Sequence, residues 1–85
     1  MDLGYRANFS DGAVDFFITL PRRRQRKLLD RARQLVTDPF VVPDYQTRDT
    51  DERDIAHLMV GGFFFTFWVD HAAKVVLITE IEDAE

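Results

Sequence analysis

The sequence predicts an α+β fold, in which a helical hairpin packs on one face of a small, mostly antiparallel sheet, in the order β-α-α-β-β-β. Three observations predict it: apolar alternation near the N-terminus, two helical patterns joined at a proline, and three strand-like runs in the C-terminal half. The 85 residues, 46% of them apolar, can build one small core. We therefore expect residues 1–85 to form a single domain.

The first strand and the first helix are predicted from a short N-terminal stretch. Tyr5, Ala7 and Phe9 alternate with polar residues, as in a half-buried strand. Ser10 suits a helix N-cap, because its hydroxyl can accept a hydrogen bond from an amide of the first turn. A short helix from Asp11 to about Leu20 follows.

The second helix is predicted to run from the proline at position 21 to about position 36. Proline is favoured in the first turn of a helix, where its missing N–H costs nothing. Asp38-Pro39 ends the helix, since the residue before a proline disfavours helical geometry. The helix carries one apolar stripe at i, i+1, i+4, i+7 and i+8: Leu28, Leu29, Ala32, Leu35 and Val36. No linker separates the two helices, so they must form a hairpin.

The remaining elements are predicted to form a meander. Residues 40–45 contain a proline and read as an extended connection, and residues 46–54 are polar and aperiodic, as in a mobile loop. A strand begins at about Arg53, Gly61-Gly62 supplies a tight turn, and an aromatic strand continues to Val69. After a turn at 70–73, the last strand runs from 74 to 81.

The aromatic strand "GGFFFTFWVD" is apolar on both of its faces. Phe63, Phe65 and Phe67 share one face, which we expect to meet the helices. The other face is predicted to be a partner-binding surface, because contiguous exposed apolar patches on small proteins usually mark interfaces. A loop or a chain terminus covering these rings is the competing interpretation. The predicted partner-binding residues are Phe64, Trp68, Met59, His57 and Glu80, and Val76 and Ile78 are expected on the same face.

Charge is unevenly distributed along a chain whose net charge is −4. The last six residues, "EIEDAE", are acidic. A basic patch opens the second helix, formed by Arg22, Arg23, Arg24, Arg26 and Lys27. This patch has two interpretations: a surface for nucleic acid or an acidic partner, or a solvated helix face.

Signatures of a metal centre, a cofactor or a nucleophile are not found in the sequence. The chain has no cysteine. His57 is the one catalytic candidate, drawn with Asp54, Glu80 or His71, but these residues have no metal-ligand spacing. We expect no metal and no cofactor. No apolar run approaches the roughly 20 residues of a membrane helix. The start "MDLGYRANF" is not typical of a signal peptide. We therefore expect a cytoplasmic protein with no membrane partner.

The order of these landmarks resembles the RelE/ParE toxin superfamily of type II toxin–antitoxin systems. The resemblance rests on the opening strand "YRANFSDGAVDFF", the Leu20-Pro21 junction before a basic helix, the Asp38-Pro39 stop, and the C-terminal "HLMVGGFFFTFWVDHAAKVVLITEI". It implies a cognate antitoxin as partner, and the ribosome with messenger RNA, or DNA gyrase, as cellular target. In its RNA-cleaving members, it implies cationic residues and a tyrosine on the open sheet face.

This sequence departs from that pattern at the positions that matter for chemistry. The two strand positions where the family commonly has arginine are occupied by Phe64 and Trp68. Neither side chain can carry positive charge, so binding is favoured over RNA cleavage and enzymatic activity stays open. We therefore expect a toxin or toxin-like relative that acts mainly by protein binding. A ribosome-dependent endoribonuclease and a non-toxic, binding or homodimerising protein are the alternatives.

Overall fold

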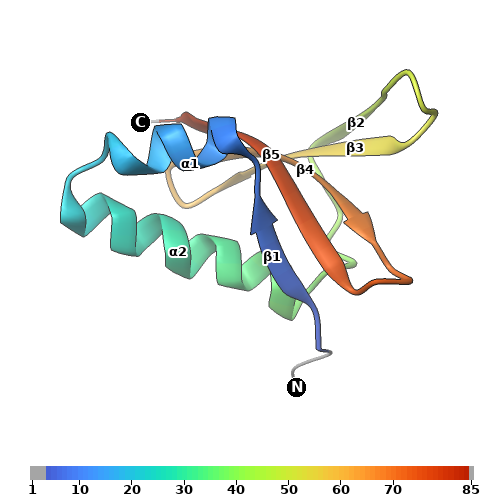
Figure 1. The fold of residues 1–85 in the computed structure, drawn as a ribbon, viewed down its shortest axis with the longest axis horizontal. Coiled ribbons are helices and arrows are strands. Elements are labelled where there is room, and N and C mark those ends of the chain that lie inside the picture. Colours follow the sequence, from blue (N-terminus) through green and yellow to red (C-terminus); the bar gives the residue numbers. More distant parts are fainter. Residues whose placement is uncertain (1–3, 85) are drawn as a thin grey trace.

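Two helices cover one face of a five-stranded sheet in the computed structural model, which describes residues 4–84 (Figure 1). The strand order is β1-β5-β4-β3-β2, with β1 parallel to β5 and the other pairs antiparallel. The predicted α+β class with a helical hairpin on one sheet face is confirmed. The elements are β1 (Arg6–Phe9), α1 (Asp11–Ile18), α2 (Arg22–Thr37), β2 (Tyr45–Arg48), β3 (Asp54–Val60), β4 (Phe63–Asp70) and β5 (Val75–Asp83).

Strand β2 is an element that the sequence analysis did not predict. Tyr45 lay in the expected connection and residues 46–48 in the expected mobile loop, but Tyr45–Arg48 pairs with β3. All four residues are exposed, so the strand buries no side chain and has no hydrophobic period to reveal it. Main-chain hydrogen bonds to the edge of β3 hold it in place. Figure 1 shows the β2–β3 hairpin projecting away from the helices.

The helix boundaries follow the predicted capping chemistry. Ser10 Oγ accepts a hydrogen bond from the Ala13 N–H and caps α1. Pro21 directly precedes α2, and the buried residues of α2 are Leu28, Ala32 and Leu35. These residues come from the predicted apolar stripe, and Val36 packs against the same core. Leu29 is the exception: it is 37% exposed, so the buried face is narrower than predicted.

The core face of β4 is the one that period two predicts. Phe63 and Phe65 are fully buried and Phe67 is 2% exposed. They pack in one cluster with residues of α1, α2, β3 and β5. Burying a phenylalanine contributes about 1.5–3 kcal/mol, so these three rings are a main source of stability.

The expected facing of β5 is partly wrong, because a bulge interrupts its pairing with β4. Thr66 pairs with Glu80 but Phe67 pairs with Ile78, which leaves Thr79 as an extra residue. The extra residue shifts the alternation of β5. Val76 and Ile78 therefore lie in the core, fully buried, whereas Glu80 lies opposite Thr66 on the other face.

The β3–β4 turn uses the predicted glycine pair. Gly61 and Gly62 have φ angles of +55° and +90°, which disfavour residues with a Cβ.

Residues 1–3 of the N-terminal stretch and residue 85 of the acidic tail lie outside the described residues. Within residues 4–84, no helix is long and apolar enough to span a membrane.

Candidate protein-binding face of the sheet

The face of the sheet opposite the helices, called the open face below, is built from rows of cross-strand neighbours. Directly paired residues point to the same side of a sheet. One row contains Tyr45, His57, Thr66 and Glu80, and the next contains Met59, Phe64 and Glu82. Trp68 lies in a third row with Leu77 and Asn8. All five predicted partner-binding residues therefore lie on one face, and their binding role remains a prediction.

Three rings form a cluster, called the aromatic cluster below, at the centre of this face. The Tyr45 and His57 rings stack with centroids 4.4 Å apart and planes 9° apart. The Phe64 centroid lies 6.1 Å from each of them. Tyr45 is 51% exposed and neighbouring Met59 is 57% exposed, so the cluster and its flank present apolar surface to solvent.

His57 is held by its neighbours through both ring nitrogens. Nε2 is 2.9 Å from Thr47 Oγ1, and Nδ1 is 3.3 Å from Thr66 Oγ1. The two hydroxyls and the Tyr45 ring fix the imidazole within the face. A general base needs a nitrogen free to take a proton from substrate, so this arrangement favours a structural role for His57 over a catalytic one.

Trp68 is covered by a residue from the β2–β3 loop. The guanidinium carbon of Arg53 lies 4.5 Å from the centroid of the Trp68 ring, within cation–π range. Trp68 itself is half-buried. For Trp68 the contact therefore supports in part the competing interpretation that a loop covers these rings, and Arg53 was not among the residues singled out from the sequence.

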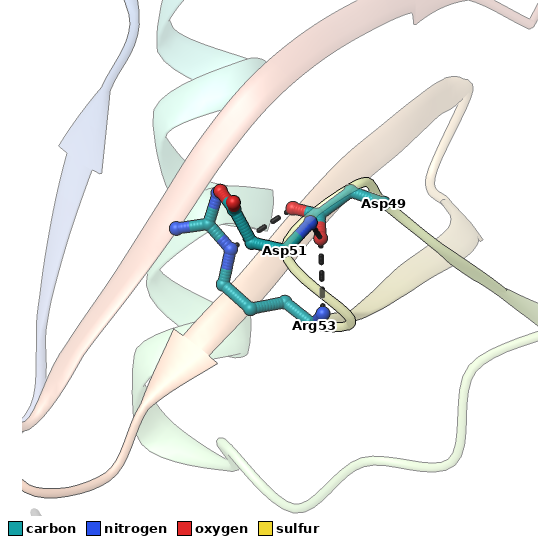
Figure 2. A network of polar contacts seen from close by, with 3 residues as sticks. All are labelled: Asp49, Asp51 and Arg53. Atoms are coloured by element: carbon teal, nitrogen blue, oxygen red, sulfur yellow. Dashed lines mark hydrogen bonds and ion pairs between the residues drawn. The ribbon is translucent and has the colours of Figure 1, made fainter.

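The loop holds Arg53 in position with two carboxylates (Figure 2). Arg53 Nε donates to Asp49 at 2.9 Å, and one terminal nitrogen of Arg53 lies 3.0 Å from the Asp51 carboxylate. Asp49 also accepts the backbone N–H groups of Arg53 and Asp51. The Arg53 N–H is the main cause that lowers the pKa of the Asp49 carboxyl, with the guanidinium adding to it.

The basic patch lies on α2, in the helix layer, and not on the open face (Figure 1). Arg22, Arg23 and Arg26 are exposed. Arg24 is different: it makes a two-pronged contact with Asp83 at 2.8 and 3.2 Å, and its guanidinium carbon lies 4.7 Å from the Phe63 ring centroid. Its side chain is only 19% exposed. Arg24 is therefore a structural part of the α2–β5 contact.

A pocket beside this patch joins the two helices. It has a volume of about 430 Å³ and is lined by arginines of α2 together with Phe17 and Leu29. The arginines are Arg22, Arg26 and Arg33. The pocket is open to solvent, and its lining combines these three arginines and Asp30 with the two apolar side chains.

A second ring cluster lies at the far end of the sheet. The Tyr5 hydroxyl is 2.8 Å from His71 Nδ1, and the Phe40 and His71 rings stack at 4.8 Å. An open pocket of about 970 Å³ extends from Phe40 and His71 to Trp68. His71 and His57 thus have separate neighbours. Among residues 4–84, no group of three or more histidine and carboxylate side chains is arranged to hold a metal ion.

Similarity to known proteins was found at the level of structure. No family model matches the chain, and no curated protein matches by sequence. The RelBE2 toxin–antitoxin complex of Mycobacterium tuberculosis contains a chain with a TM-score of 0.76 and 19% identity, covering 93% of this chain and 96% of that one. A chain of the archaeal RelE–RelB complex of Pyrococcus horikoshii has a TM-score of 0.72 and 20% identity, covering 99% of this chain and 97% of that one.

A third match extends the likeness to another organism. A chain of the RelBE toxin–antitoxin complex of E. coli has a TM-score of 0.64 and 18% identity, covering 96% of this chain and 99% of that one. The three matches span nearly the whole of each chain, so the likeness is not confined to one motif. The chain therefore has a RelE-like fold, as its sequence landmarks indicated.

Proposed function

We propose that this chain is the toxin component, or a toxin-like relative, of a type II toxin–antitoxin system, and that it acts mainly by binding protein through the open face. The structural neighbours come from toxin–antitoxin complexes, which supports an antitoxin as the partner. The observation that carries the mode of action is the aromatic cluster at Tyr45, His57 and Phe64. These rings and exposed Met59 form an apolar surface where RNA chemistry would need cations.

RNA cleavage is the alternative that the basic patch favours. Arg22, Arg23 and Arg26 are exposed and could contact phosphates. They lie in the helix layer, however, apart from the open face, where His57, Tyr45, Glu80 and Glu82 are the groups able to carry a proton. Both nitrogens of His57 lie beside hydroxyls. A third alternative, a non-toxic protein that pairs with a second copy of itself, uses the same apolar face.

The test compares two cation insertions of matched exposure. Met59→Arg places a charge on the open face, and Ile18→Arg places one on α1, where Ile18 is 64% exposed. The protein is co-expressed with the product of the adjacent reading frame, and the mass of the purified species is measured by light scattering. We expect Met59→Arg to lose the complex and Ile18→Arg to retain it, because only the first residue lies in the docking surface.

Each other outcome has a definite meaning. A complex retained by Met59→Arg overturns the proposed docking face. A mass of two copies that only Met59→Arg reduces to one supports the homodimer instead. Incubation with RNA and ribosomes, followed by mapping of 5′ ends, is expected to show no cleavage above a His57→Ala control. Cleavage that His57→Ala removes would establish the endoribonuclease.

A further inference from the structure

The charges around the aromatic cluster are predominantly negative. The row through Tyr45 and His57 ends at Glu80, and the row through Met59 and Phe64 ends at Glu82. Both carboxylates are exposed, and within residues 4–84 neither has an ion-pair partner. These two rows contain no lysine and no arginine.

A third carboxylate, Asp44, lies at the β2 edge of the sheet. Asp44 accepts the backbone N–H of Met59 at 2.9 Å, and its own N–H donates to the His57 carbonyl at 2.8 Å. These two bonds fix Asp44 beside the edge strand β2. The Asp44 carboxylate is thus bound to the main chain at the sheet edge, and the carboxylates that share rows with the aromatic cluster are Glu80 and Glu82.

The cations of the open face lie away from these two rows. Arg53 covers Trp68 and is already held by Asp49 and Asp51. Arg6 shares a row with Val75 and Asp70, so the negative charge of Asp70 lies in the same row as the positive charge of Arg6. The centre of the face therefore combines apolar surface with uncompensated negative charge, which repels a polyanion and attracts a cation.

We propose that the partner segment that docks on this face is a cationic amphipathic helix, with its apolar side on the aromatic cluster and lysine or arginine residues at the end that lies over β5. This inference rests on the proposed docking face and adds the chemistry of its occupant. A helix is favoured over an extended strand because the face, unlike a sheet edge, offers no free main-chain groups, and a helix satisfies its own backbone hydrogen bonds.

The spacing of the strands sets the length of the segment. The step from β2 to β5 is three strand spacings, or about 14 Å at roughly 4.8 Å each. A helix rises about 1.5 Å per residue, so about nine or ten residues should separate the start of the helix over β2 from its cations over β5. Apolar residues at i, i+3, i+4 and i+7 between them would contact Phe64, Met59 and Tyr45.

The test uses two synthetic 18-residue helical peptides that share one leucine stripe and carry either lysine or glutamate at the polar positions. Isothermal titration calorimetry measures the affinity of each peptide directly, because Trp68, the only tryptophan of the chain, lies beneath Arg53 and outside the aromatic cluster. We expect the lysine peptide to bind at least about tenfold more tightly than the glutamate peptide, with an affinity that falls as salt is added.

Two double variants test whether the negative charge of the open face determines which peptide binds more tightly. Glu80→Lys/Glu82→Lys should reverse the order of the two peptides. The control, Asp15→Lys/Asp38→Lys, makes the same change of net charge at exposed positions in the helix layer and should leave the order unchanged. Circular dichroism checks that both variants fold.

The outcomes separate this inference from the proposed function. If both peptides bind equally and Met59→Arg abolishes both, the docking face stands and its charge preference is overturned. If the glutamate peptide, or a single-stranded RNA oligonucleotide, binds more tightly than the lysine peptide, the inference is wrong. If calorimetry detects binding of neither peptide, both the inference and the docking face fail.

Discussion

The Arg53 guanidinium carbon lies 4.5 Å from the centroid of the Trp68 ring, so the only tryptophan of the chain is covered by a residue of its own β2–β3 loop. Asp49 and Asp51 hold the arginine in place. This contact divides the open face into two parts: a covered tryptophan near the loop, and an aromatic cluster that presents Tyr45 and Met59 to solvent. The second part is the one that we propose for docking.

Removing the covering side chain should expose the tryptophan. In Arg53→Ala we expect acrylamide to quench Trp68 emission more efficiently, and the free energy of unfolding to fall by about 1 kcal/mol, the magnitude of an exposed cation–π contact. The control is Arg48→Ala. It removes an arginine that pairs with Asp54 at 3.4 Å and that does not cover the indole ring of Trp68. Equal quenching of Trp68 in the two variants would mean that Arg53 does not cover the ring in solution.

The position of Arg53 should depend on pH through Asp49. Hydrogen bonding by the Arg53 N–H lowers the pKa of Asp49 in the folded protein below the ordinary value of 3.8. The stabilisation from this carboxylate is therefore complete above the unfolded pKa and is lost as the pH falls through the lower, folded pKa. We expect a change in Trp68 emission with a midpoint below pH 3.8. Asp49→Asn keeps an oxygen acceptor but cannot titrate, so the variant should lack this change in Trp68 emission. If the change persists in Asp49→Asn, another titrating group causes it.

Much of the fold could be predicted because its signals are local. The cap at Ser10, the glycine pair after β3 and the period of two in β4 act within a few residues, and each is found where the sequence placed it. The same period placed Phe64 and Trp68 on one face with His57 and Met59. What the sequence could not supply is the environment of those rings, because Tyr45 and Arg53 reach them from another strand and a loop.

Two features were missed for physical reasons. Strand β2 is stabilised by main-chain pairing with β3 and buries no side chain, so no hydrophobic pattern marks it. The extra residue at Thr79 depends on how β5 pairs with β4, which a single strand does not encode. It moved Val76 and Ile78 into the core and left Glu80 on the open face.

The turn at Gly61 should be sensitive to a single added methyl group. Gly61 has a φ of +55°, and a Cβ there would collide with the side chain of Arg31, whose buried Nε has no hydrogen-bond partner among residues 4–84. We expect Gly61→Ala to lower the free energy of unfolding by about 1–2 kcal/mol from the backbone alone, and by more because Arg31 must move. In an Arg31→Ala background the cost should shrink toward the backbone value, which a double-mutant cycle in urea measures.

Gly12 provides the matched control for that substitution. It lies in α1, where an added Cβ would meet only Ser10 Oγ at an ordinary 3.9 Å. Gly12→Ala should therefore stabilise the protein by roughly 0.5–1 kcal/mol, as expected for an exposed helical glycine. If Gly61→Ala lowers the free energy of unfolding by the same amount with and without the Arg31 side chain, the two residues are not in contact.

The arginines of the basic patch should differ in their effect on stability, although they are adjacent in sequence. Arg24 contacts Asp83 at two points and lies over Phe63, with its side chain 19% exposed, whereas Arg23 is exposed. A partly buried two-pronged ion pair with a cation–π contact is worth about 1–2 kcal/mol, and an isolated surface arginine close to zero. Arg24→Ala should therefore lower the urea midpoint clearly, while Arg23→Ala should leave it unchanged. Equal urea midpoints for the two variants would mean that Arg24 behaves as a solvated surface residue. The α2–β5 contact would then depend on apolar packing alone.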